Sequence, residues 1–195
     1  MLALVDCRVA SAHTLVLIHK LPARERAAQL SKLNMAQNEA LTFMPNVSLA
    51  DMPNERFHAA LSYWLNQRAG RELPLASAID PLRLPRPLLP FLMMISVEPG
   101  PKRLLFRLVG TGVVEAIGYD PTGKFGEDVE GAGPTNERFL ATLETKTPYI
   151  YGGPLIWSSN DYKSYQSVVM PFGDEAGNVV RFLSYTEFKS KWTGR

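Results

Sequence analysis

The side chains of this sequence that come closest to a catalytic set are four carboxylates. Glu115, Asp120, Asp128 and Glu144 all fall in a helical segment that we expect to cover a sheet. A carboxyl group held inside a cavity could donate or accept a proton in general acid–base catalysis. Acidic side chains at helix and turn positions usually face water, however. We therefore predict no catalytic residue and keep, as an alternative function, a small α+β enzyme that uses carboxylates in a cone-shaped pocket.

Histidine and cysteine are too scarce for the other common kinds of site. The three histidines are His13, His19 and His58, and the single cysteine is Cys7. A Ser-His-Asp or Cys-His nucleophile system needs a histidine near the reacting group, and an ordinary zinc site needs several histidine or cysteine ligands. We predict neither of these sites and no metal. One cysteine also excludes an internal disulfide, which favours a reducing cytoplasm.

Length, charge and hydropathy describe an ordinary globular protein. The chain has 195 residues, of which 46% are hydrophobic, with 21 basic and 19 acidic side chains for a formal net charge of +2. The basic residues are scattered singly, so no electrostatic footprint for nucleic acid is visible. The longest uncharged apolar run, residues 87–97, is far shorter than the roughly 20 residues of a membrane helix. We expect neither a nucleic-acid nor a membrane partner.

The elements that would position these side chains begin after an N-terminal extension. Residues 1–50 are predicted to be disordered or partly helical, with one short amphipathic helix at 24–33, and Met35 is a candidate for the true translation start. Residues 51–195 form the predicted domain. Its first helix carries an apolar stripe with Phe57, Leu61 and Trp64 at helical spacing. Four prolines between residues 80 and 90 then predict a rigid connector.

The rest of the chain alternates between extended and helical patterns. Residues 91–98 and 103–111 predict a hairpin, and short helical turns follow at 113–117. Pro134 begins a helix that ends near Thr147, after which residues 149–157, 164–172 and 179–188 predict three strands. Strands and helices that are segregated in this way form an α+β fold, here a five-stranded antiparallel sheet with helices on one face plus an N-terminal helix.

Several short motifs in this order resemble the PAS superfamily. The stretches 106–112, 115–120 and 122–124 are similar to the segment of PAS domains that leads from a strand to a helix. The helix with Trp64, followed by Asp80-Pro81, resembles the leading helix and connector of small bacterial proteins with a single PAS domain. The resemblance covers residues 57–188. It implies a sensory or interaction module. PAS domains that bind haem usually hold the iron through a histidine on the helix that corresponds to 134–147, which has none here. Flavin attached through cysteine is equally unexpected because Cys7 precedes the domain. The cofactor is left unknown.

A ligand pocket of such a domain would lie between the sheet and its helical cover. The candidate lining residues are Phe106, Leu108, Val114, Ile117, Tyr119, Phe139, Leu143, Val168 and Met170, each of which could equally be ordinary core. Arg107 lies between two of them on a strand and is a possible anchor for an anion if a bulge turns it inward. Tyr149, Tyr151 and Tyr165 could add hydroxyls at the rim, or could be ordinary sheet aromatics.

Three functions remain open from the sequence. The domain is a sensor of a small apolar molecule, a protein-interaction module with a filled core, or the carboxylate enzyme. A cavity of roughly 300 Å³ or more would favour the sensor, and a close-packed interior the interaction module. In PAS proteins the leading helix often pairs with a second subunit, so Phe57, Leu61 and Trp64 are candidates for a homodimer contact, and the partner is a second copy or another signalling protein.

Overall fold

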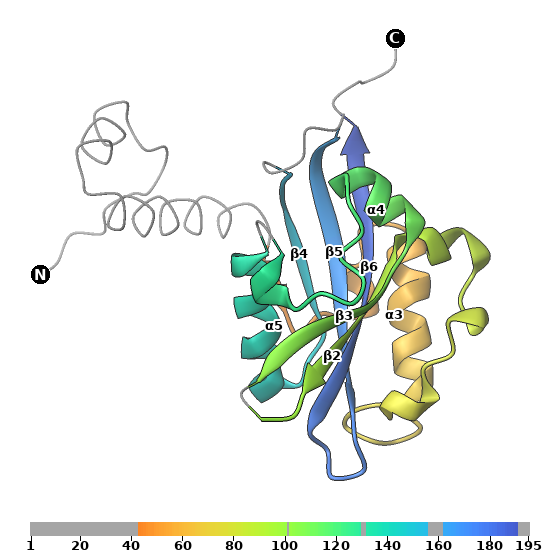
Figure 1. The fold of residues 1–195 in the computed structure, drawn as a ribbon. Helices are drawn as coiled ribbons and strands as arrows, with labels where there is room; N and C mark the ends of the chain where they lie inside the picture. The colour runs from red at the N-terminus through yellow and green to blue at the C-terminus, as the bar shows by residue number, and fades with distance from the viewer. Residues whose placement is uncertain (1–42, 101, 130–131, 156–161, 191–195) are drawn as a thin grey trace, which may run out of the picture. The chain divides into compact units, whose positions relative to one another are not determined.

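The computed structural model describes residues 43–100, 102–129, 132–155 and 162–190 of the chain (Figure 1). These residues belong to a unit that begins at Phe43. The expected helix at 24–33 and the alternative start at Met35 lie outside the described residues. None of the described helices is both long enough and apolar enough to cross a bilayer.

The centre of the fold is an antiparallel sheet of six strands. Its strands are β1 (Phe43–Pro45), β2 (Leu92–Glu98), β3 (Arg103–Val109), β4 (Tyr149–Pro154), β5 (Tyr162–Gly173) and β6 (Val179–Ser190). They lie in the order β1-β4-β5-β6-β2-β3. The chain must therefore cross one face of the sheet to pass from β3 at one edge to β4 near the other. The helices of this crossing build the wall of the site described below.

Five of these strands match the predicted sheet, and β1 is the addition. It is three residues long and pairs with β4, with Phe43 opposite Tyr151 and Pro45 opposite Tyr149. Three residues are too few to show the alternation that identifies a strand, and proline is tolerated in a sheet only at an edge. Both β1 and the 3-10 helix η1 (Leu49–Asp51) fall largely within the stretch that the sequence assigned to the extension.

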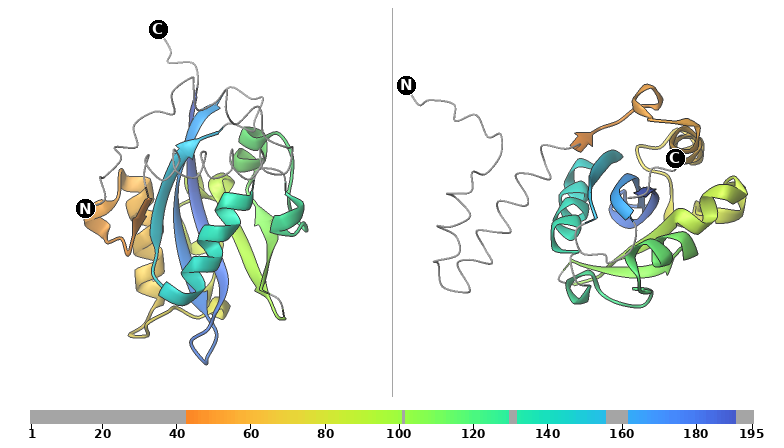
Figure 2. Two further views of the ribbon diagram at one scale, coloured as in Figure 1. Left: turned by 90° about the vertical axis from the view of Figure 1, so that its left-hand side faces the viewer. Right: turned by 90° about the horizontal axis from the view of Figure 1, so that it is seen from above.

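Helices cover both faces of the sheet: the crossing helices lie on one face, as predicted, and the predicted N-terminal helix covers the other. Helices α4 (Thr111–Ile117) and α5 (Gly133–Thr145) belong to the crossing, together with η5 (Gly126–Asp128). The leading helix α3 (Glu55–Gln67) lies against the opposite face, as the end view of Figure 2 shows. Ring contacts establish the two sides: Phe139 of α5 meets Phe182 of β6 at 4.9 Å between centroids, and Phe57 of α3 meets Tyr185 at 5.1 Å. Phe182 and Tyr185 are three residues apart on one strand, so they point to opposite faces.

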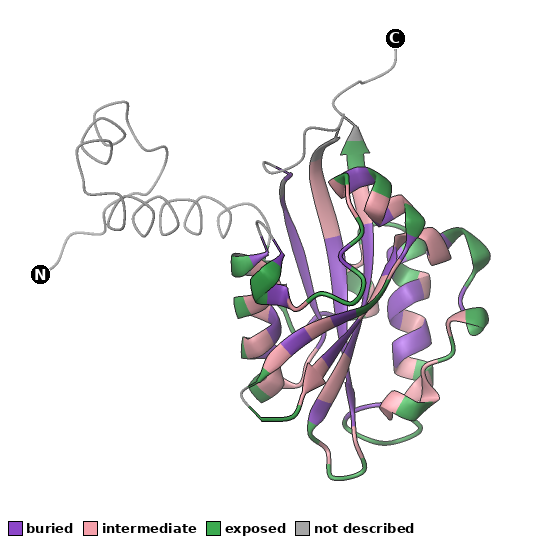
Figure 3. Cartoon of the chain, viewed as in Figure 1, coloured by how far each residue is buried: buried purple, intermediate pink, exposed green. Residues whose placement is uncertain are grey.

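Helix α3 is fixed at its start and along its buried stripe. The side chain of Asn54 accepts hydrogen bonds from the backbone N–H groups of Arg56 and Phe57 and so caps the helix. Trp64 is buried, and its indole N–H donates to the carbonyl of Pro171 on β5 at 2.6 Å. Burial of each large side chain is worth about 1.5–3 kcal/mol. The stripe predicted from the sequence is therefore part of the core, as the colouring of α3 in Figure 3 shows.

The connector between α3 and β2 contains short 3-10 turns where the prolines predict a rigid segment. They are η2 (Ala76–Ala78), η3 (Pro81–Arg83) and η4 (Arg86–Phe91). The side chain of Asp80 accepts a hydrogen bond from the backbone N–H of Leu82 at 3.0 Å. The backbone N–H of Asp80 donates to the Tyr63 hydroxyl at 2.7 Å. These bonds tie the connector to α3.

Candidate functional site

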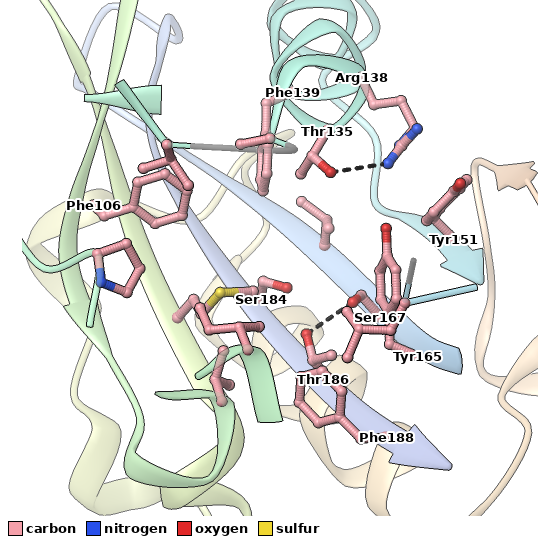
Figure 4. Close-up of a pocket in the computed structure, with 18 of the residues that line it drawn as sticks. Phe106, Thr135, Arg138, Phe139, Tyr151, Tyr165, Ser167, Ser184, Thr186 and Phe188 are labelled. Atoms are coloured by element: carbon pink, nitrogen blue, oxygen red, sulfur yellow. Dashed lines mark hydrogen bonds between the residues drawn. The ribbon is translucent and has the colours of Figure 1, made fainter. Parts of the chain in front are cut away.

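A pocket of about 100 Å³ lies between the crossing helices and the sheet. Its walls come from α4, α5 and β3, and its floor from β4, β5 and β6 (Figure 4). The apolar part of the lining includes Phe106, Val113, Ile117, Phe139, Val169 and Phe188. Among the described lining residues there is no aspartate or glutamate. The interior is therefore mainly apolar and carries no acidic group of the described chain.

Three hydroxyl groups lie on the floor of the pocket. The Ser167 and Thr186 hydroxyls on neighbouring strands form a buried hydrogen bond of 2.8 Å. The third, Ser184, is 1% exposed, and its Oγ has no hydrogen-bond partner among the described residues. A buried hydroxyl without a partner costs free energy, roughly 1–3 kcal/mol. The Ser184 hydroxyl is thus an unsatisfied polar group in the pocket floor, and an occupant can hydrogen-bond it only if neighbouring side chains shift, because the oxygen has almost no accessible surface.

One end of the pocket is formed by an arginine among tyrosines. The guanidinium of Arg138 lies over the ring of Tyr151, with 3.5 Å from its central carbon to the ring centroid, and its Nη2 donates to the Thr135 hydroxyl at 3.1 Å. Tyr149 and Tyr165 line the same end. Burial raises the pKa of both phenols well above the ordinary value, and the charge of Arg138 opposes this only in part. At neutral pH these tyrosines are therefore uncharged.

Four of the nine predicted pocket residues lie in the lining. These are Phe106 on β3, Ile117 on α4, Tyr119 after α4 and Phe139 on α5. Val114 does not line the pocket; its neighbour Val113, one helical turn before Ile117, does. Leu143 is partly buried against the core and is not part of the lining. The predicted rim tyrosines Tyr149, Tyr151 and Tyr165 do line the pocket.

A β-bulge explains why Leu108 and Arg107 lie outside the pocket. Phe106 pairs with Ile95 but Leu108 pairs with Met94, so β3 has one extra residue between them, Arg107. A shift of one residue moves the following side chains to the other face of the sheet. Leu108 is consequently 40% exposed. The Arg107 side chain donates to the Ser96 hydroxyl and forms an ion pair with Glu98, and neither partner lines the pocket.

Val168 and Met170 face α3 and not the pocket. They pair across the sheet with Tyr185 and Leu183, whose side chains lie on the α3 side. Their neighbours on β5, Ser167 and Val169, line the pocket instead. Because both faces of the sheet are covered, residues 168–170 are all apolar. The sequence here shows no alternation of polar and apolar residues from which the side chains that face the pocket could be identified.

The residues predicted for a dimer contact are used inside the chain. Phe57 and Leu61 are fully buried and Trp64 is nearly so. Their side chains pack against β5 and β6, as the Phe57–Tyr185 ring contact and the Trp64–Pro171 hydrogen bond show. This placement leaves no surface of the three side chains for a second subunit.

The four carboxylates considered for catalysis are at exposed positions. Glu115, Asp120, Asp128 and Glu144 all lie outside the lining of the pocket. Hydrogen bonds from Thr122 lower the pKa of Asp120, which stabilises a local turn. Among the described residues, no group of three histidine, cysteine, aspartate or glutamate side chains is placed to hold a metal ion. The acid–base chemistry considered from the sequence thus lacks a carboxylate in the pocket.

Sequence reasoning missed Arg138, Thr135 and Ser184. Thr135 lies four residues before Phe139 on α5, so helical spacing from Phe139 would have found Thr135, and the spacing of three from Thr135 would then have found Arg138. Ser184 follows from strand alternation with Phe182 once one face of β6 is known. The polar residues of the pocket were thus recoverable from periodicity, but only with a facing residue as the starting point.

Comparisons with known proteins address the fold. A family model described as PAS domain matches residues 52–125, the stretch from α3 to the end of the loop after α4. No curated protein sequence matches the chain. The solved structures that the chain matches include the light-state LOV domain of the blue-light photoreceptor Aureochrome1, with 10% identity, a TM-score of 0.39 and coverage of 53% of this chain and 84% of that one.

Two further structures are similar at the same level. A Light-Oxygen-Voltage domain studied with a flavin analogue has 17% identity, a TM-score of 0.37 and coverage of 51% of this chain and 77% of that one. An RNA-binding Light-Oxygen-Voltage receptor has 11% identity, a TM-score of 0.38 and coverage of 92% and 65%. The family match ends before α5 and β4, so Arg138 and the pocket tyrosines Tyr149, Tyr151 and Tyr165 lie outside the matched residues.

Proposed function

From the match of a PAS domain model to residues 52–125, we propose that the chain is a sensory module of this family whose ligand occupies the pocket beneath α4 and α5. The observation that carries the proposal is the Ser184 hydroxyl, which is buried in the pocket floor without a partner among the described residues. Plain core packing would place an apolar side chain or a hydrogen-bonded hydroxyl at this position. A ligand with a polar atom near Ser184 would satisfy it.

The size of the pocket limits the ligand. An engineered cavity of about 150 Å³ holds one benzene molecule, so a cavity of about 100 Å³ encloses about four non-hydrogen atoms, and a larger ligand must extend to the rim. Drug-sized ligands occupy roughly 300 Å³ or more. Haem and the ring system of a flavin exceed this space, whereas a small organic molecule fits. The sensor we propose is therefore specific for a metabolite of small size.

The signal is proposed to leave the domain by contact with another protein. Either a second copy of the chain or another signalling protein would receive it, and the site of action is expected to be the cytoplasm. A homodimer would need a surface other than the buried side chains of Phe57, Leu61 and Trp64. Helix α3, which carries these three residues, lies directly on β5 and β6, so a shift of these strands would move the helix.

A protein-interaction module with a filled core is the second candidate. The small volume of the pocket favours it, since about 100 Å³ is below the range of most ligand sites. The unpartnered hydroxyl of Ser184 and the arginine at the pocket end speak for the sensor. The carboxylate enzyme has no supporting observation in the described lining.

Native mass spectrometry of freshly purified protein tests the proposal, combined with two variants of adjacent residues. Val113→Phe places a ring into the pocket, whereas Val114→Phe adds the same atoms on the same helix outside the lining. We expect a co-purifying or added small molecule on the wild-type protein and on the Val114 variant but not on the Val113 variant. Equal loading of both variants would place the ligand elsewhere and contradict the proposal.

A further inference from the structure

Arg138 carries a positive charge that no described acidic side chain balances. The ion pairs of the described chain join other arginines to carboxylates, namely Arg56, Arg71, Arg83, Arg103 and Arg107. Arg138 is only partly exposed and contacts the Thr135 hydroxyl and the Tyr151 ring instead. A charge that is partly withdrawn from water is costly unless it is paired.

The tyrosines around Arg138 do not supply the missing negative charge. Burial keeps the phenols of Tyr149 and Tyr165 protonated, as described above. A protonated phenol can still accept or donate a hydrogen bond. The tyrosines therefore form a polar but neutral frame around the guanidinium.

The guanidinium has donors to spare. An arginine carries five N–H groups in a planar fork. Its Nη2 donates to Thr135, and the guanidinium also hydrogen-bonds the Tyr149 hydroxyl, which still leaves N–H groups for a further acceptor. The Tyr151 ring lies against one face of the guanidinium and so fixes the plane of the guanidinium. The edge of the guanidinium remains for a planar acceptor. A carboxylate matches this edge with two parallel hydrogen bonds. A phosphate would bring up to two negative charges against this single cation.

The opposite end of the pocket is apolar. Figure 4 shows Phe106 far from Arg138, with Phe139 between them on the α5 side. Val113 and Ile117 of α4 add further apolar side chains to the lining. An occupant must therefore have one charged end and one hydrocarbon end.

We propose that the pocket recognises a small organic monocarboxylate, whose carboxylate pairs with Arg138 and whose apolar body of about four to seven carbons lies towards Phe106. This inference rests on the proposed sensory function and names its ligand class. It assigns the anion-binding role to Arg138 on α5 and not to Arg107 on β3, which is already paired with Glu98 on the other face.

Benzoate and its neutral counterpart benzamide test the inference, because they share ring and size and differ in charge. We expect isothermal titration calorimetry of the full chain to show benzoate binding at least about tenfold tighter than benzamide, the ratio that charge-assisted hydrogen bonds provide. In Arg138→Met the affinity for benzoate should fall about 10- to 100-fold, and that for benzamide should change less than about threefold. Arg107→Met is the matched control and should leave both affinities unchanged.

The outcomes separate this inference from the proposed function. If benzoate and benzamide bind the wild-type protein equally, the pocket binds ligands but the carboxylate inference is overturned. If neither binds, and benzene also fails to shift amide resonances of the lining residues, both proposals are overturned. If Arg138→Met does not fold, the ratio of the benzoate and benzamide affinities of the wild-type protein still tests the inference. Arg138→Lys keeps the positive charge but not the planar guanidinium, and it should retain part of the preference for benzoate.

Discussion

Ser184 and Tyr185 are consecutive residues of β6 whose side chains lie on opposite faces of the sheet. Ser184 lies in the floor of the pocket, and Tyr185 packs its ring against Phe57 of α3. The Tyr185 hydroxyl donates to Glu187, which also accepts from Asn54, the cap of α3. A single peptide unit thus separates the floor of the pocket from the contacts that hold α3.

Replacement of Ser184 by alanine should stabilise the ligand-free protein. The change removes a buried hydroxyl without a described partner, so the free energy of unfolding in urea should rise by about 1 kcal/mol. Ser167→Ala is the matched control, because it breaks the hydrogen bond with Thr186 and should lower the free energy of unfolding by about 1 kcal/mol. A loss of stability in Ser184→Ala would mean that the hydroxyl is already satisfied in the purified protein.

Replacement of Leu61 by alanine should destabilise the single chain. Leu61 is a fully buried residue of α3, so its truncation should lower the free energy of unfolding, measured in urea or by heat, by about 2–5 kcal/mol. Leu82→Ala removes the same atoms from a side chain that is 85% exposed and should change stability by less than about 0.5 kcal/mol. If the Leu61 effect grew as the protein was diluted, the residue would belong to a subunit interface and not to the core.

Stability should fall at alkaline pH because of the buried tyrosines. Burial raises the pKa of Tyr149 and Tyr165 above the ordinary value near 10. Above that pH the unfolded chain releases phenolic protons that the folded chain retains, so the free energy of unfolding decreases as pH rises. We expect urea midpoints to decline from about pH 10 upwards, and the decline to be shallower in Tyr149→Phe. Equal slopes in the two proteins would show that Tyr149 ionises as readily in the folded chain as in the unfolded one.

Gly110 should not tolerate a side chain. Its backbone N–H donates to Leu92 at 2.8 Å, and a Cβ at this position would meet the backbone carbonyls of Pro90 and Leu89. We expect Gly110→Ala to lower the free energy of unfolding by about 1–3 kcal/mol and to weaken ligand binding, because α4 begins at the next residue. Gly133→Ala meets no atom within 4 Å and should be neutral or slightly stabilising. Similar losses in both variants would exclude close approach as the cause.

Local patterns were sufficient for most of the fold. The two hairpins, the proline connector and the amphipathic helices depend on neighbours in sequence, and the predicted strand bounds agree with the structure within a few residues. The class of fold followed from the order of these elements, because two strands, a helical crossing and three strands leave few ways to form one sheet.

The side chains of the pocket were harder to predict because facing depends on tertiary structure. Arg107 as an extra residue of β3 turned Leu108 away, and no feature of residues 103–109 alone reveals the bulge. On β5 the cover of both faces made Val168 and Val169 alike in sequence but opposite in direction. Arg138 was missed because an arginine on a helix is usually solvated.

The pairing of β1 with β4 places a mechanical joint at the edge of the site. Tyr149 and Tyr151, which frame Arg138, are the residues opposite Pro45 and Phe43. An edge strand of three residues is held by few backbone hydrogen bonds, so β1 depends on the side chains that flank it. Phe43 contributes to these contacts, because its ring lies 5.6 Å from that of Tyr149 between centroids, and β1 thus supports the same tyrosine that borders Arg138.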